Sequence, residues 1–234
     1  MAKVAGKEQK WATNVVLVRH GESVANIERD RLKKGATKEM FLKMPCRDMD
    51  IPLTEKGIKQ AKSAGKLLKN YPKFDVAIIS PYVRAKQTAE IIIKEMGYRI
   101  PLVFEERIRE KDFGVLDKVT EKGKIKYYPL EAEREKWDGK YYYRPYGGEN
   151  YPDVALRIRS FFDTLIRKYK KENVLVVTHA ITILMFRKLL EHLSEKEVLD
   201  IHANQKLKNG SISAFVYDSQ SKDLVLKEWN RTGY

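Results

Sequence analysis

Residues 14–21, which read Asn-Val-Val-Leu-Val-Arg-His-Gly, join a short apolar run to an abrupt polar end. Such a run, rich in β-branched residues, is typical of a buried strand. Two further runs have the same form: residues 75–79 end at Ser80, and residues 174–177 end at Thr178. Helical patterns lie between these runs. Short apolar strands that alternate with helices predict a parallel sheet covered on both faces.

The expected fold class is α/β, with three layers in the order α/β/α around a mainly parallel, mixed sheet. A closing hairpin at residues 212–217 and 224–229 would supply the antiparallel part. Helices are predicted at residues 54–68, 82–96, 152–170 and 181–192, with Thr54 as an N-cap and Gly97 as a stop. No linker is visible, so we expect residues 1–234 to form a single domain. Residues 114–148 lack clear periodicity and are predicted to be an insertion or cap.

The composition excludes wholesale disorder, because 43% of the 234 residues are hydrophobic. No apolar run is long enough to cross a membrane, and the polar N-terminus has no secretory signal. Cys46 is the single cysteine, so an internal disulfide is impossible. A cytoplasmic location, without a membrane partner, is therefore expected.

The net charge of +14 favours anionic partners such as phosphate esters, nucleic acid or anionic lipid. The lysines are spread over the whole chain, and no nucleic-acid-binding motif is visible. We therefore interpret most of the excess charge as a solvated surface, and no nucleic-acid partner is expected.

Polar residues with a shared chemistry follow the three strands: Arg19 and His20, then Arg84, then His179. Ligands of open parallel sheets bind beyond the carboxyl ends of the strands. Arginine donates paired hydrogen bonds to phosphate oxygens. Each residue alone would be weak evidence, since it could be a strand-end turn, a solvated helix residue or a satisfied histidine. Together they predict an oxyanion pocket.

Five motifs in order make the chain resemble the histidine phosphatase superfamily, which includes the cofactor-dependent phosphoglycerate mutases. The motifs occupy residues 17–26 (LVRHGESVAN), 50–57 (DIPLTEKG), 80–89 (SPYVRAKQTA), 108–114 (IREKDFG) and 176–179 (VVTH). The resemblance covers residues 14 to about 217 and implies the fold of that family. Five matches in order are a much stronger signal than any one of them.

The resemblance implies that His20 is the nucleophile and forms a phosphohistidine. Arg19, Arg84 and His179 would hold the phosphoryl oxygens, and Ser23 and Asn26 would contact the substrate.

A carboxylic acid must protonate the leaving oxygen and then accept a proton from water. The candidates share one short segment: Glu105, Glu106, Glu110 and Asp112. The position of Glu110 before Phe113-Gly114 resembles the family's acid-bearing loop and favours Glu110. Residues 141–150, which include Arg144, resemble another stretch of the family's sequence. Arg144 is therefore expected to line the substrate pocket. Packing of this aromatic segment as part of the cap, without a role in binding, is an equal alternative.

The leading hypothesis is a metal-independent phosphatase that acts on small phosphomonoesters, with a phosphorylated small molecule as its substrate. No metal site or cofactor is expected, since His and Cys residues are few and not grouped. Only 68 residues separate Glu110 from His179, which resembles the phosphatase branch. A phosphoglycerate mutase and a non-catalytic phosphate-binding module are the alternatives. The substrate and a homodimeric state are left open.

Overall fold

The computed structural model of the protein describes residues 9–34 and 39–234. Within them, six strands form one sheet in the order β3-β2-β4-β1-β5-β6. The strands are β1 (Asn14–Arg19), β2 (Val76–Ile79), β3 (Leu102–Phe104), β4 (Asn173–Thr178), β5 (Ile212–Asp218) and β6 (Asp223–Arg231). Strands β1 to β4 are parallel, whereas β5 and β6 form an antiparallel hairpin at one edge. The predicted mixed sheet is confirmed.

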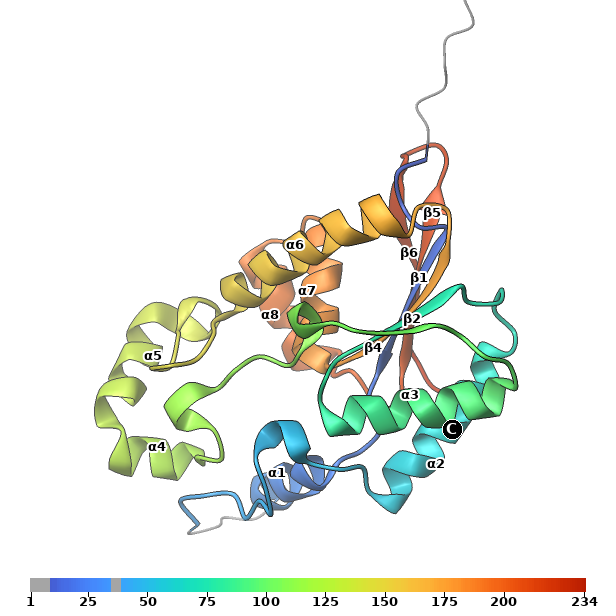
Figure 1. The fold of residues 1–234 in the computed structure, drawn as a ribbon. Coiled ribbons are helices and arrows are strands. Elements are labelled where there is room, and N and C mark those ends of the chain that lie inside the picture. Colours follow the sequence, from blue (N-terminus) through green and yellow to red (C-terminus); the bar gives the residue numbers. More distant parts are fainter. Residues whose placement is uncertain (1–8, 35–38) are drawn as a thin grey trace, which may run out of the picture.

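Helices cover both faces of this sheet (Figure 1). The helices are α1 (Val24–Lys34), α2 (Glu55–Leu68), α3 (Val83–Met96), α4 (Glu121–Tyr127), α5 (Pro129–Tyr142), α6 (Tyr151–Lys168), α7 (Ala180–Leu190) and α8 (Glu195–Asn204). Three short 3-10 turns are η1 (Asp48–Asp50), η2 (Glu106–Ile108) and η3 (Gly114–Leu116). The predicted α/β/α layering is therefore confirmed.

Alternate residues of β1 pack into two separate cores, because neighbouring side chains of a strand point to opposite faces. Val15 and Leu17 pack with α6 and α7. Val16 and Val18 pack with α2 and α3. A strand buried on both faces is continuously apolar, which is the pattern that predicted it from the sequence.

Capping residues fix where three helices begin or end. Thr54 accepts a hydrogen bond from Gly57 N at 3.0 Å and is the N-cap of α2, as predicted. Gly97 ends α3 in the left-handed conformation with φ of 83°, also as predicted. Helix α6 begins at Tyr151, where Asn150 and Asp153 form a capping box.

Two glycines bring the loop after β1 against the start of α2. A Cβ atom on Gly21 would lie 2.4 Å from Gly57 O, and one on Gly57 would lie 2.0 Å from Glu22 O. Both distances are far below van der Waals contact, so only glycine fits at either position. This close approach fixes the loop that carries His20.

Residues 114–148 hold η3, α4 and α5, and Figure 1 shows α4 and α5 away from the sheet. We call α4 and α5 the cap helices. They pack on each other, and α5 also packs on α6. Leu42 N donates to Lys118 O at 2.7 Å. This hydrogen bond connects the segment before η1 to the residues that lead into the cap helices. No helix in the described residues is long and apolar enough to cross a membrane.

Candidate active site

Three parallel strands deliver polar residues to one end of the sheet. Strand β1 leads to Arg19 and His20, β2 leads through Ser80 to Arg84 in the first turn of α3, and β4 leads to His179 at the start of α7. The rings of His20 and His179 lie with their centroids 5.1 Å apart. The strand ends therefore converge as the sequence predicted.

The side-chain hydrogen bond of His20 shows which ring nitrogen keeps a free lone pair. The side chain is 3% exposed, and Nδ1 lies 2.7 Å from the carbonyl oxygen of Gly21. Because a carbonyl only accepts, Nδ1 carries the proton and Nε2 carries the lone pair. Burial, followed by the charges of Arg84 and Arg19, lowers the pKa of His20 well below its usual value. The imidazole is thus neutral at physiological pH.

His179 is fully buried beside His20. Its Nε2 lies 2.7 Å from Ser80 Oγ, and its ring meets the Tyr82 ring edge to face at 5.0 Å between centroids. Its Nδ1 is buried without a hydrogen-bond partner within the described chain. An unsatisfied buried nitrogen is costly, which is expected where a ligand supplies the partner.

Arg19 contributes a second unsatisfied group. Its Nη1 donates to the Leu207 carbonyl, while Nε is buried without a partner among the described residues. Burial lowers the pKa of Arg19 to about 10, so the guanidinium remains charged at neutral pH.

Arg84 is 3% exposed and is held by Asp48 of η1. Its Nη2 lies 3.0 Å from Asp48 Oδ2, and its Nη1 donates to the backbone oxygen of Asp48. The guanidinium also lies 4.8 Å from the centroid of the Tyr82 ring. Asp48 was not predicted as a site residue, because nothing in its local pattern marks it as the partner of a residue 36 positions away.

Asn26 is oriented by three hydrogen bonds to its amide oxygen. Ser23 N, Ser23 Oγ and Asn209 Nδ2 donate to Asn26 Oδ1 at 3.0, 3.1 and 3.0 Å. The NH₂ group of Asn26 is therefore the group that can donate to a ligand. Ser23 is 1% exposed and positions Asn26. Asn209 was missed from the sequence, where an Asn-Gly pair before a strand indicates only a turn.

The four candidate acids lie in different surroundings. Burial raises the pKa of Glu110, whose charge is also sensed by Arg19. Glu105 pairs with Arg107 at 2.6 Å, Asp112 Oδ1 accepts from Gly114 N, and Glu106 is exposed. Glu110 is therefore the candidate beside the strand ends. Its role as the acid stays a prediction.

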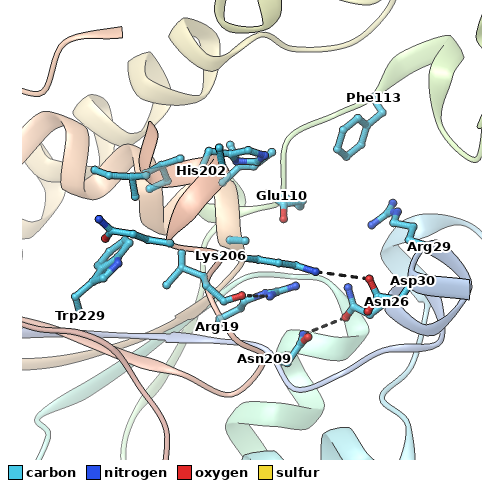
Figure 2. A pocket seen from close by; sticks show the side chains of 17 residues that line it. Arg19, Asn26, Arg29, Asp30, Glu110, Phe113, His202, Lys206, Asn209 and Trp229 are labelled. Carbon is cyan, nitrogen blue, oxygen red and sulfur yellow. Dashed lines mark hydrogen bonds and ion pairs between the residues drawn. The ribbon is translucent and has the colours of Figure 1, made fainter. Parts of the chain in front are cut away.

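A cavity of about 450 Å³ opens beside Arg19, Asn26 and Glu110 (Figure 2). Its far wall is apolar and comes from α7, α8, the segment after α8, and β6, with Ile181, Leu184, Ile201, Leu207 and Trp229. A second cavity of about 320 Å³ lies toward the cap helices and shares Phe113, Ile181 and His202 with the first. His20, Arg84 and His179 are nearly fully buried and do not line either cavity. Both volumes suit a small ligand.

Arg144 is not brought to the site. It pairs with Asp153 near the start of α6, its side chain is 55% exposed, and it lines neither cavity. The N-cap of α6 is Asn150 and not the neighbouring Glu149, because the Asn150 side chain accepts from Asp153 N. Glu149 instead contacts the loop that carries Glu110, as described below.

The chain is similar to known proteins in sequence. The chain matches the description "Histidine phosphatase superfamily (branch 1)" over residues 15–232. A 2,3-bisphosphoglycerate-dependent phosphoglycerate mutase 2 from Gloeobacter violaceus is 33% identical over 187 residues, which cover 79% of this chain and 78% of that protein.

Two solved phosphatase structures share the fold. The alpha-ribazole phosphatase from Shigella flexneri has a TM-score of 0.73 at 21% identity, covering 93% of this chain and 96% of that chain. A mycobacterial glucosyl-3-phosphoglycerate phosphatase in complex with VO3 has a TM-score of 0.70 at 24% identity, covering 94% of this chain and all of that chain.

Proposed function

The chain belongs to the histidine phosphatase superfamily, and from this premise we propose that it hydrolyses small phosphomonoesters through a phosphohistidine at His20. The observation that carries the proposal is the orientation of His20. Its Nδ1–H is committed to Gly21 O, so Nε2 presents a lone pair. The unsatisfied nitrogens of Arg19 and His179 supply donors for phosphoryl oxygens beside it.

In the first step, the Nε2 lone pair of His20 attacks phosphorus and the bond from phosphorus to the ester oxygen breaks. Arg19, Arg84 and His179 stabilise the oxygens of the transferred group. The raised pKa of Glu110 favours its protonated form, which gives its proton to the leaving oxygen. The alcohol then departs, and Glu110 is left as a carboxylate.

In the second step, a water molecule attacks the phosphohistidine. The Glu110 carboxylate takes a proton from this water as the bond from nitrogen to phosphorus breaks. Inorganic phosphate is released, and both His20 and Glu110 return to their starting protonation states. The cycle needs one acid that works in both directions, and burial of Glu110 suits that double role.

A phosphoglycerate mutase is the second candidate, and one buried lysine favours it. Lys111 is 8% exposed, lines the cavity under the cap helices and lies over the Phe113 ring at 4.8 Å. No described residue gives its ammonium group a carboxylate or hydrogen-bond partner. A cation at the wall of a cavity, without a carboxylate partner among the described residues, would suit a second anionic group on the substrate. The 33% identity to a protein named as a mutase also supports this candidate.

The proposal is tested by hydrolysis of p-nitrophenyl phosphate in the presence of EDTA. His20→Ala should abolish turnover, whereas His192→Asn, at an exposed histidine with φ of 54°, should leave it unchanged. Radiolabelled phosphate should be trapped on the intact protein and not on His20→Ala. Equal turnover in the intact protein and His20→Ala would contradict the nucleophile assignment.

A second assay distinguishes mutase activity from phosphatase activity. The intact protein is given 3-phosphoglycerate together with 2,3-bisphosphoglycerate, and both inorganic phosphate and 2-phosphoglycerate are measured. Release of phosphate without isomerisation supports the phosphatase. Isomerisation faster than phosphate release would make the mutase the main activity.

A further inference from the structure

The loop that carries Glu110 has its backbone oxygens fixed one after another. Arg157 of α6 donates to Arg107 O at 2.6 Å and to Glu110 O at 3.2 Å. Thr178, at the end of β4, donates to Ile108 O at 2.5 Å, and Thr182 of α7 donates to Arg109 O at 2.8 Å. We call residues 107–112 the acid loop. Its path is therefore set by side chains from other elements.

Arg157 is in turn held by Glu149. Arg157 Nε donates to Glu149 Oε1 at 2.9 Å, and Nη2 lies 3.2 Å from Oε2. The same carboxylate accepts from Asp112 N at 3.0 Å and from Arg109 Nη2 at 3.0 Å. Glu149 therefore joins one end of the acid loop to the arginine that fixes the other end.

The pair is largely buried, with side-chain exposures of 14% for Glu149 and 11% for Arg157. Burial alone would raise the pKa of Glu149, but the hydrogen bonds and charge of Arg157 outweigh it and hold the pKa below its usual value. The carboxylate is thus ionised at neutral pH. A buried ion pair is weak evidence for stability, because desolvation offsets most of its attraction. A precise placement of the acid loop is a better explanation for it.

We propose that Glu149 and Arg157 are positioning residues that set the place of Glu110 for proton transfer. The proposal rests on the function proposed above, in which Glu110 protonates the leaving oxygen. The charged groups of both residues are engaged with each other and with the acid loop, so they are expected to act through that loop and not by binding the substrate. They act through the backbone oxygens of Arg107 and Glu110.

Proton transfer depends steeply on this placement, since a general acid must lie within hydrogen-bond reach of the leaving oxygen. The need for the proton depends on the leaving group. p-Nitrophenolate is a stable anion and leaves without full protonation, whereas an alkoxide leaves only as the alcohol. A displaced Glu110 therefore slows phosphoryl transfer from an alkyl phosphate much more than from p-nitrophenyl phosphate.

The test compares Glu149→Gln and Arg157→Lys with the control Glu228→Gln. Glu228 is a matched control, because its carboxylate also pairs with an arginine, Arg231 at 3.0 Å, and accepts from the Tyr71 hydroxyl at 2.8 Å, but it lies on β6 and does not contact the acid loop. The readout is kcat/KM for propyl phosphate and for p-nitrophenyl phosphate, since kcat/KM reports the first chemical step and excludes the later hydrolysis of phosphohistidine.

We expect Glu149→Gln to lower kcat/KM for propyl phosphate about 10- to 100-fold, as for other residues that orient a reacting group. The value for p-nitrophenyl phosphate should change less than about threefold, while a burst of p-nitrophenolate appears because water attack on the phosphoenzyme also needs Glu110. Arg157→Lys should follow the same pattern. An equal fall for both esters, or no fall for either, would overturn the proposal.

A measurement that does not depend on catalysis tests the positioning role separately from the proposed phosphatase function. Amide hydrogen exchange of a peptide spanning residues 108–113 should be faster in Glu149→Gln than in Glu228→Gln. Glutamine offers one acceptor oxygen in place of the two that receive Asp112 N, Arg109 and Arg157, so the hold on the Asp112 amide is weakened. If the intact protein hydrolyses neither ester, the proposed function fails, and exchange then decides the positioning role. Unchanged exchange of the acid loop would overturn that role.

Discussion

The proposed phosphate-binding residues and the acid loop are built in different ways. Arg19 is the last residue of β1, and His20 and His179 directly follow β1 and β4, so the sheet places all three. The acid loop contains no strand and only one 3-10 turn, and arginine and threonine side chains from α6, β4 and α7 place it instead. The first region is fixed by packing of the core. The second depends on individual hydrogen bonds, and this difference makes their responses to mutation distinct.

The largest effect is expected in the phosphate-binding region. Arg84→Ala removes a buried cation that is expected to hold the transferred phosphoryl group, and should lower kcat/KM for every ester about 10²- to 10³-fold. The reason is that charge on the phosphoryl oxygens is common to all substrates. Steady-state kinetics with p-nitrophenyl phosphate and propyl phosphate check this. A loss restricted to propyl phosphate would place Arg84 with the acid loop in function.

Two buried lysines in the second cavity allow a comparison next to the acid loop. Lys124 contacts Glu121 and Glu135, and these hydrogen bonds outweigh burial and raise its pKa, whereas burial lowers the pKa of Lys111. Lys124→Met should lower the free energy of unfolding by about 1.5–3 kcal/mol, since it removes charged hydrogen bonds. Lys111→Met should raise it, because an unpaired buried charge is replaced by an apolar chain. Urea unfolding measures both, and destabilisation by Lys111→Met would contradict the unpaired state.

The two regions should respond to pH with opposite signs. His20 and His179 have lowered pKa values, mainly through burial, so the unfolded chain binds more protons below the ordinary histidine pKa of 6.5. Their contribution to stability is complete above pH 6.5 and is lost as the pH falls, by about 1.4 kcal/mol per pH unit for each histidine. Glu110 has a raised pKa, so its contribution is lost as the pH rises above 4.5.

Unfolding free energies measured from pH 4.5 to 8 would separate these contributions. The double variant His20→Asn, His179→Asn should lose most of the decline below pH 6.5. Glu110→Gln should instead become relatively more stable than the intact protein toward neutral pH. An unchanged pH dependence in the double variant would show that the two imidazoles are not held neutral.

The smallest effect is expected from one anchor of the acid loop. Thr182→Val keeps the shape of the side chain but removes the hydrogen bond to Arg109 O, which should cost about 1 kcal/mol of stability. Loss of this one anchor should lower kcat/KM for propyl phosphate less than Glu149→Gln does. If Thr182→Val has the larger effect, α7 rather than α6 dominates the placement of Glu110.

The difference between regions placed by core packing and regions placed by single hydrogen bonds also explains which elements could be predicted from the sequence. Buried strands and capped helices leave periodic patterns, so β1, β2, β4, α2 and α3 were predicted within one or two residues of their bounds. Helices α1 and α8 were not predicted, because each carries only a few apolar residues on a largely polar sequence. Helix α5 was also not predicted, because Gly139 with φ of 71° interrupts it.

Side-chain partnerships over long sequence distances left no pattern. The contact of Asp48 with Arg84 and that of Arg157 with Glu110 O depend on how separate elements pack. Asp48 and Arg157 look like ordinary surface charges in the sequence. The proposed phosphate-binding residues could be located from strand ends and motifs, whereas the side chains that hold the acid loop could be found only in the structure.

The three tryptophans give the protein a built-in optical signal. Trp137 on α5 is 91% exposed, Trp229 lines the first cavity, and Trp11 packs edge to face against Phe162. A water-soluble quencher such as iodide should therefore extinguish the emission of Trp137 first. The remaining emission then comes from Trp11 and Trp229. A ligand that enters the cavity beside Trp229 should change the wavelength or intensity of that emission. Ligand screening by fluorescence titration thus needs neither a label nor a known reaction.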